Sequence, residues 1–198
     1  MISREPTIER LAIAQQLLLE PFGLNESHLA RALAEIRAHK VDDADLYFQY
    51  TRSEGWSLEE GIVKTGSFSI DQGVGVRAVS GEKTAFAYSD DISEASLLDA
   101  ARTVRSIASV SKSARAKVGA RKVAGSRSLY SHLDPIASMD STAKVALLER
   151  AEKLARSKDP RVVQVMACLA GESDVVIVAR AEGRLAADVR PLVRMFVT

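Results

Sequence analysis

Cysteine is almost absent from this sequence, which contains one, Cys168, among 198 residues. A single cysteine excludes an intrachain disulfide and is typical of the reducing cytoplasm. Apolar runs are short, and none approaches the roughly 18 residues that a membrane span needs. The segment 1–6 carries an acid and a proline where a signal peptide would begin its apolar stretch. We therefore expect a cytoplasmic protein with no membrane partner.

Motifs for catalysis are also missing. Neither His-Glu-x-x-His nor His-Glu-x-x-x-His occurs, and these are the spacings that direct two imidazoles to one metal. Cys168 has no other cysteine or histidine near it in sequence, so we expect it to pack as a small apolar strand residue. There is no Gly-x-Ser-x-Gly elbow. We predict no catalytic residue, no metal ligand and no cofactor-binding residue in these 198 residues.

Charge of one sign is not in excess, because 27 Lys and Arg face 26 Asp and Glu. The net charge of +1 provides no global attraction to nucleic acid or to an acidic substrate. The local exception lies between Asp99 and Asp134, where eight basic residues and no acid occur. No aromatic residue is interleaved among them to stack on bases. This favours a basic flexible loop at 111–134 over a nucleic-acid partner.

The rest of the sequence has ordinary globular composition, with 46% hydrophobic and 27% charged residues. Apolar residues at helical spacing predict helices over 7–20, 26–39 and 94–109. Pro21 and Gly23 end the first helix, Asn25 caps the second, and Ser93 caps the third. A fourth helix is predicted from about Asp140 to Ser157.

Strands are predicted where the apolar period changes to two, within 44–89. We expect a first strand that ends near Thr51 and a second, interrupted at Gly61, over 56–64. Shorter strands at 67–70, 74–78 and 84–88 follow. Because short connections cannot make parallel pairs, these strands form an antiparallel meander.

The second half of the sequence repeats this order with one helix and three strands. The predicted strands are 161–170, 175–179 and 185–198, with a turn at 172–174 between the first two. Pro191 marks a sheet edge or a bulge, because proline cannot donate to a ladder. The apolar residues up to Thr198 suggest that further strands outside this sequence complete the sheet.

The predicted fold class is therefore α+β, with helices followed by an antiparallel meander, repeated once with a shorter helix plus three-strand unit. The predicted division has three parts: an N-terminal α+β domain over 1–110, the basic flexible loop over 111–134, and a helix plus antiparallel strands over 135–198.

Glycines recur on one face of a predicted strand in the segment from Gly73 to Ala78. The segment fits Gly-x-Gly-x-x-Gly/Ala loosely, but dinucleotide binding needs that pattern to open a helix, and here it alternates as a strand. Glycine on a strand face lets another backbone approach closely. We therefore predict a contact with an extended peptide or another subunit, made by Asp71, Gln72, Gly73, Gly75 and Arg77.

Three segments resemble the TldD branch of the TldD/PmbA family. They are 45–49 (Asp-Leu-Tyr-Phe-Gln), 71–88, which starts Asp-Gln-Gly-Val-Gly-Val-Arg-Ala, and 186–194 (Ala-Ala-Asp-Val-Arg-Pro-Leu-Val-Arg). Pro21-Phe22-Gly23-Leu24 is a minor match, and the segments span nearly the whole chain in family order. The region 111–128 shows no family pattern.

The resemblance implies a cytoplasmic zinc metallopeptidase that cleaves extended or unfolded peptides and works with a related subunit of the family, as a heterodimer or a homodimer. The family's zinc ligands, a His-Glu-x-x-x-His helix and a later cysteine, belong to a C-terminal part that this sequence does not contain. We therefore expect an N-terminal scaffold and substrate-channel region, inactive alone, with zinc in the full-length parent only. The alternative is a DNA- or gyrase-associated interaction protein without enzymatic activity, which the basic segment and the family's old description would favour.

Overall fold

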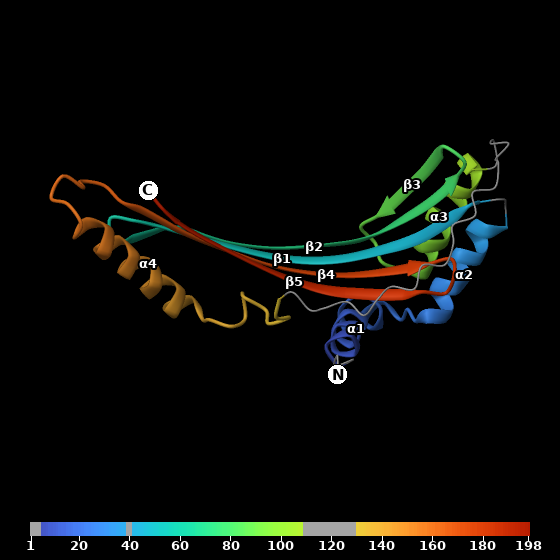
Figure 1. The fold of residues 1–198 in the computed structure, drawn as a ribbon, viewed down its shortest axis with the longest axis horizontal. Coiled ribbons are helices and arrows are strands. Elements are labelled where there is room, and N and C mark those ends of the chain that lie inside the picture. Colours follow the sequence, from blue (N-terminus) through green and yellow to red (C-terminus); the bar gives the residue numbers. More distant parts are fainter. Residues whose placement is uncertain (1–4, 39–40, 109–129) are drawn as a thin grey trace. The chain divides into compact units, whose positions relative to one another are not determined.

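The structure is a computed structural model that describes residues 5–38, 41–108 and 130–198. In these residues the chain forms four α-helices and one five-stranded antiparallel sheet, which confirms the α+β class (Figure 1). The helices are α1 (Glu5–Leu18), α2 (Glu26–Arg37), α3 (Glu94–Ala108) and α4 (Ser141–Arg156). The strands are β1 (Asp43–Glu59), β2 (Ile62–Ser80), β3 (Lys83–Ser89), β4 (Met166–Arg180) and β5 (Leu185–Val197), in the order β3-β2-β1-β4-β5.

The chain divides into two compact units, each built from three stretches of sequence. Unit 1 comprises Met1–Tyr50, Gln72–Leu129 and Val175–Val189, and unit 2 comprises Thr51–Asp71, Tyr130–Asp174 and Arg190–Thr198. Four strands contribute residues to both units, because each of these strands is long. The division at 110 and 135 that the sequence suggests stays a prediction, and the basic segment 111–128 lies outside the described residues.

The helix ends follow the local signals in the sequence. After α1, the chain makes a short 3₁₀ turn at Glu20–Phe22, and Gly23 adopts the left-handed conformation at φ 66°. The Asn25 side chain accepts a hydrogen bond from the Ser27 N–H at 2.9 Å, while His28 Nδ1 accepts from the Asn25 N–H at 3.1 Å. This reciprocal arrangement satisfies amides that the first turn of α2 leaves unpaired.

The core of unit 1 is the face of the sheet that carries alternate apolar residues. Leu46 and Phe48 of β1 are fully buried, as are Val76 of β2 and Ile177 of β4. Helices α2 and α3 contribute residues to the same core, such as Ile36, Leu97 and Val104, and α1 contributes Leu18. The alternation from residue 44 onward therefore marks the buried face that the sequence predicts.

The core of unit 2 is smaller and forms where α4 packs on the sheet. Leu58 of β1, Leu148 of α4 and Ala167 of β4 are all fully buried, and Trp56 and Leu169 pack against them. The Asp140 side chain caps α4 by accepting from the Ala143 N–H at 2.7 Å. Apolar burial in this unit therefore depends mainly on one helix and the strands under it.

Several strands are longer than the sequence suggests, and four predictions are wrong. The predicted break after Thr51 lies inside β1. The predicted strand 56–64 is divided between β1 and β2 by a hairpin turn in which Glu60 and Gly61 have φ of 54° and 71°. The two predicted strands 67–70 and 74–78 are parts of the single strand β2. The predicted turn at 172–174 lies inside β4, so two strands close the described chain and not three.

Polar partners explain why the strands continue through these positions. Asp174 accepts a hydrogen bond from Thr51 Oγ1 at 2.8 Å and lies 3.6 Å from the guanidinium of Arg190. Arg52 pairs with Asp134, and Glu54 pairs with Lys144. In the sequence these polar residues suggest breaks between strands. In the structure their side chains are paired with neighbouring elements, so the backbone hydrogen bonds of the strands continue past them.

Candidate functional site

The residues predicted to contact a peptide or subunit lie along β2. Asp71 and Gln72 are exposed, Gly73 is half-buried, Gly75 is buried and Arg77 is exposed. Asp71 is the last β2 residue of unit 2, and Gln72 is the first of unit 1. The proposal that these five residues form a contact site is not tested by their placement, but the structure gives a reason for each glycine and for the arginine.

Both glycines accommodate close contacts with β3. A Cβ atom on Gly73 would lie 2.8 Å from the backbone oxygen of Ser89, and one on Gly75 would lie 3.0 Å from the ring of Phe86. In the register of the hairpin, Gly75 pairs with Tyr88 and Arg77 pairs with Phe86. The lack of side chains at Gly73 and Gly75 predicts room for a second backbone. At these two residues, β3 of the same chain occupies that room.

Arg77 belongs to a row of charges across β2, β1 and β4 in unit 1. Its guanidinium donates to Asp45 and lies 3.8 Å from Asp43, and Arg180 binds Asp43 at 2.7 Å. The hydrogen bond to Asp45 is the main reason that the pKa of Arg77 is raised. Since its charge is matched within the sheet, Arg77 is a cross-strand partner more than a binding group for an external carboxylate.

The outer edge of β2 is open over much of its length. β3 pairs only with Val74–Ser80, while β2 begins at Ile62, so no described strand pairs with the outer side of 62–73. Every residue from Ile62 to Asp71 is exposed, including Phe68 at 57% and Ile70 at 50%. Such an edge presents unpaired N–H and C=O groups to any extended chain.

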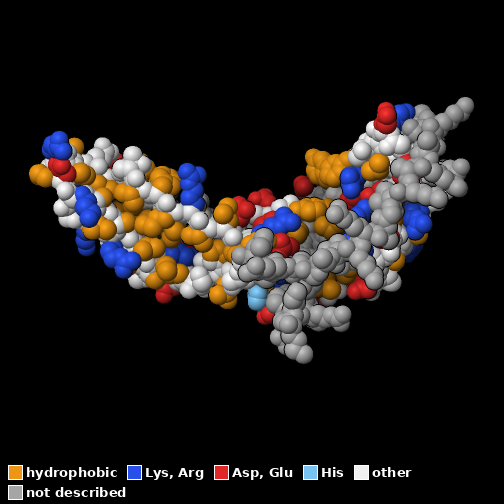
Figure 2. Space-filling view, in the orientation of Figure 1, with side chains coloured by type: hydrophobic (Ala, Val, Ile, Leu, Met, Phe, Trp, Pro, Cys, Tyr) orange, Lys and Arg blue, Asp and Glu red, His pale blue; other side chains and the backbone are white. Residues whose placement is uncertain are grey.

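The second edge of the sheet, β5, is also apolar in unit 2. Leu192, Val193, Met195, Phe196 and Val197 are each at least 39% exposed. β5 is the last described strand on its side and contains Pro191, which confirms the predicted edge position of this proline. Hydrophobic side chains cover much of the visible surface on the left of Figure 2, where unit 2 lies. Surfaces of this kind mark interaction sites.

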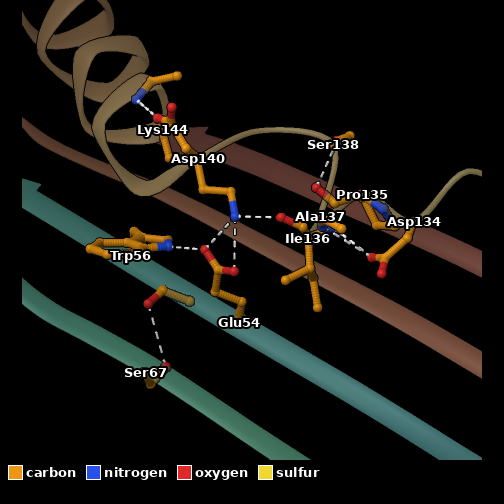
Figure 3. A network of polar contacts seen from close by, with 12 residues as sticks. Glu54, Trp56, Ser67, Asp134, Pro135, Ile136, Ala137, Ser138, Asp140 and Lys144 are labelled. Carbon is orange, nitrogen blue, oxygen red and sulfur yellow. Dashed lines mark hydrogen bonds and ion pairs between the residues drawn. The ribbon is translucent and has the colours of Figure 1, made fainter.

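A buried ion pair lies in unit 2 beneath α4. Lys144 Nζ is 2.8 Å from one carboxylate oxygen of Glu54 and 2.9 Å from the other, and it also donates to the Ile136 carbonyl at 2.8 Å (Figure 3). Trp56 donates its indole N–H to Glu54. The side chains of Lys144 and Glu54 are only 7% and 11% exposed.

The environment of Glu54 sets its charge. Burial raises the pKa of this carboxyl, but the hydrogen bonds from Lys144 and Trp56 and the ammonium charge together bring the pKa below its ordinary value. A pocket of about 170 Å³ adjoins the pair and is lined by apolar residues that include Met139, Leu147 and Leu169. Lys144 Nζ contacts three oxygen atoms, so the ion pair fixes α4 and the segment 134–140 to β1. These contacts give Lys144 a structural role.

The described residues do not gather a zinc site. No group of three or more His, Cys, Asp or Glu side chains could hold a metal ion there. His28 Nδ1 is used in the cap of α2, Cys168 lies half-buried in β4, and His39 lies outside the described residues. The donors that zinc prefers are therefore separated, and no step through a metal can be derived from this region. No described helix is long and apolar enough to cross a membrane.

Helices packed against an antiparallel sheet whose edge strands are exposed define an α+β protein. Two sequence profiles identify the family: the PmbA/TldA metallopeptidase domain 1 matches residues 44–108, and the PmbA/TldA metallopeptidase central domain matches residues 134–198. The chain belongs to the PmbA/TldD metallopeptidase family, which confirms the resemblance seen in the sequence.

Curated relatives support this assignment and show how much of the family protein is present. A metalloprotease TldD homolog of Haemophilus influenzae is 43% identical over 182 residues, covering 91% of this chain and 38% of the relative. A homolog from Buchnera aphidicola subsp. Schizaphis graminum is 38% identical over 188 residues, covering 95% of this chain and 38% of the relative. The chain thus spans 38% of the length of these relatives.

Solved structures share the fold at low sequence identity. A proposed DNA gyrase modulator from Bacteroides thetaiotaomicron matches with a TM-score of 0.67 at 13% identity, covering 85% of this chain and 39% of that one. TldE from Thermococcus kodakarensis matches with a TM-score of 0.59 at 14% identity, covering 86% and 38%. At this identity the likeness shows a common fold.

The close approach at Gly73 predicts that even a methyl group destabilises the sheet. Gly73→Ala forces Cβ against the Ser89 oxygen, and we expect a loss of about 1–3 kcal/mol in the free energy of unfolding, measured by urea denaturation. Gly171→Ala is the control, because its Cβ would lie 3.5 Å from Ile136 in ordinary contact. Equal stability of the two variants would contradict the packing role of Gly73.

The buried ion pair predicts a stability change whose size depends on pH. Lys144→Met leaves Glu54 buried without its cation, so we expect a loss of about 3 kcal/mol at pH 7. In the wild type, the lowered pKa of Glu54 contributes stability that is present at neutral pH and is lost as pH falls through the folded-state pKa. In the variant the hydrogen bond from Trp56 remains, but Lys144 no longer opposes burial, which is the largest influence on this pKa, so protonation favours folding.

The loss in the free energy of unfolding that Lys144→Met causes should therefore be smaller at about pH 4 than at pH 7, as measured by denaturant unfolding at each pH. The double variant Glu54→Leu/Lys144→Met serves as the matched control, since it removes both charges and should recover most of the loss at pH 7. If this loss in the free energy of unfolding were the same at every pH, the ion pair would not be its cause.

Proposed function

We propose that this chain is the scaffold and substrate-channel region of a TldD-type zinc metallopeptidase that cleaves extended peptides. The observation that carries the proposal is the open edge of β2 in unit 2, Ile62–Asp71. An extended peptide can add to such an edge through main-chain hydrogen bonds, which tolerate many side chains. A peptidase of broad specificity needs this kind of contact, because its substrates share a backbone and little else.

The apolar residues of the edge supply the remaining affinity. Phe68 and Ile70 alternate with Ser67 and Ser69, so they lie on the same face of β2. The ring of Trp56 packs against Gly66, where a Cβ atom would lie 3.2 Å from the ring. A peptide strand added beside β2 would therefore place alternate side chains next to Phe68 and Ile70, and burying each of these is worth about 1.5–3 kcal/mol.

Catalysis belongs, in this proposal, to the part of the family protein that this chain does not span. The relatives named metalloprotease TldD homolog are longer, and this chain covers 38% of their length. Zinc bound by residues of that remaining part would polarise the scissile carbonyl and activate water. A related subunit is the proposed partner, with the apolar β5 strand and the predicted residues Asp71, Gln72, Gly73, Gly75 and Arg77 as candidate contacts.

The alternative, a DNA- or gyrase-associated protein without enzymatic activity, has no specific observation in its favour. Its sequence support is the basic segment 111–128, which lies outside the described residues. The gyrase-modulator name belongs to a structural neighbour at 13% identity, which shares the fold.

The proposal predicts peptide binding without cleavage by the purified chain. A fluorescently labelled, uncharged peptide of alternating Val and Thr should bind, as measured by anisotropy, and should stay intact with or without added zinc. Phe68→Lys/Ile70→Lys should weaken binding about tenfold or more, because apolar burial at the edge is lost.

Leu154→Lys is the matched control, since Leu154 of α4 is 57% exposed, as is Phe68, and lies away from the sheet edges on a helix. This variant should bind as the wild type does. Unchanged binding by the β2 double variant, or chelator-sensitive hydrolysis by the chain alone, would contradict the proposal.

A further inference from the structure

A groove in unit 1 runs beside β3. In the sheet order β3 is the edge strand at the opposite side from β5, as the ribbon drawing shows (Figure 1). The volume of the groove is about 610 Å³. One wall is Phe86–Ser89, four consecutive residues of β3. Because consecutive strand residues line it, the groove follows the backbone edge of β3 and not only one face of the strand. No described strand pairs with that edge.

The second wall of the groove is one face of α3. It is formed by Ala95, Ser96, Asp99 and Thr103, which recur at helical spacing. Alanine, serine and threonine are short, so this wall leaves space between the helix and the strand edge. Asp99 is the only charged residue among the described residues that line the groove. No ion pair joins its carboxylate to another residue that the structure describes.

An aromatic pair stands on the outer face of β3. Phe86 and Tyr88 are 60% and 74% exposed, and their rings stack with centroids 6.4 Å apart and 23° between their planes. The absence of a side chain at Gly75 lets the Phe86 ring lie against β2, and the Tyr88 ring stacks with it. Aromatic side chains have few rotatable bonds, so they bind at low entropic cost and are effective anchors.

We propose that this groove binds an unstructured peptide segment of another protein as an added strand on β3, with alternating apolar and basic residues. Side chains of a strand alternate between two faces, so one set of the peptide's residues would lie against Phe86 and Tyr88 and the other set toward α3. The α3 wall carries the Asp99 carboxylate, and exposed Asp90 follows β3 at its end, so the second set is basic. The site lies in unit 1, whereas the β2 edge proposed above lies in unit 2.

The test uses the purified chain and a blocked peptide of alternating Val and Lys, with a Val–Glu peptide of equal length for comparison. The Val–Lys peptide should bind, as measured by anisotropy, and the Val–Glu peptide should bind at least about tenfold more weakly. Asp99→Asn should weaken Val–Lys binding about two- to fivefold, the range for losing one exposed ion pair. Tyr88→Ser and the groove-filling Ala95→Trp should each weaken it about tenfold or more.

Main-chain pairing has its own signature. Successive N–H groups of a strand point to opposite sides, so methylating every second peptide nitrogen should abolish binding in one phase of alternation and leave it nearly unchanged in the other. Ala146→Trp, which places the same side chain on an exposed alanine of α4, is the control and should bind the Val–Lys peptide normally.

Four results would overturn the inference. Three are equal loss from both methylation phases, unchanged binding by Ala95→Trp, and concentration-dependent self-association of the chain that Ala95→Trp abolishes, which would make a second copy the occupant. The fourth is loss of binding by the β2 double variant alone, which would assign the peptide to the β2 edge. The groove can therefore fail while the proposed function stands, and the reverse also holds.

Discussion

Main-chain hydrogen bonding along β1 is the constraint on which the rest of the structure depends. β1 is 17 residues long and lies between β2 and β4 in the sheet order, so it joins the β1-β2-β3 meander to the β4-β5 hairpin. Its alternate residues form the buried face of unit 1 through Leu46 and Phe48, and they support α4 in unit 2 through Glu54 and Leu58. A strand that long needs partners throughout, because unpaired buried backbone groups are costly.

The same constraint explains where the molecule is left open. The central strand β1 has a hydrogen-bonded neighbour strand on each side, whereas the outer side of β2 is paired over only part of its length, since β3 is 7 residues long and β2 is 19. The unpaired part of β2 is solvated and exposes Phe68 and Ile70, while β5 exposes an apolar row. Natural edge strands are often protected by charge, bulges or short length. The unpaired stretch 62–71 carries two charged residues, Lys64 and Asp71, and exposes Phe68 and Ile70, so it is long and partly apolar and is suited to accept a partner strand.

Local signals made the helices and the fold class predictable, while contacts distant in sequence did not. Asn25 and Asp140 act on amides two or three residues away, so their capping could be inferred from the sequence. Asp174 and Glu54 look like loop residues because their partners, Thr51 and Lys144, lie 123 and 90 positions away. The glycines of the predicted site stand out in the sequence, but the reason for them is that β3 folds back onto β2, which no local pattern reveals.

Amide hydrogen exchange along β2, with and without a bound extended peptide, tests the account most directly. The free chain should show fast exchange at alternate amides of 62–71, whose N–H groups point away from β1, and slow exchange at the amides between them. Added peptide should slow the fast set and leave the slow set unchanged. Uniform protection of 62–71 in the free chain would mean that this edge is already paired, and fast alternate amides that no extended peptide slows would mean that it binds no strand.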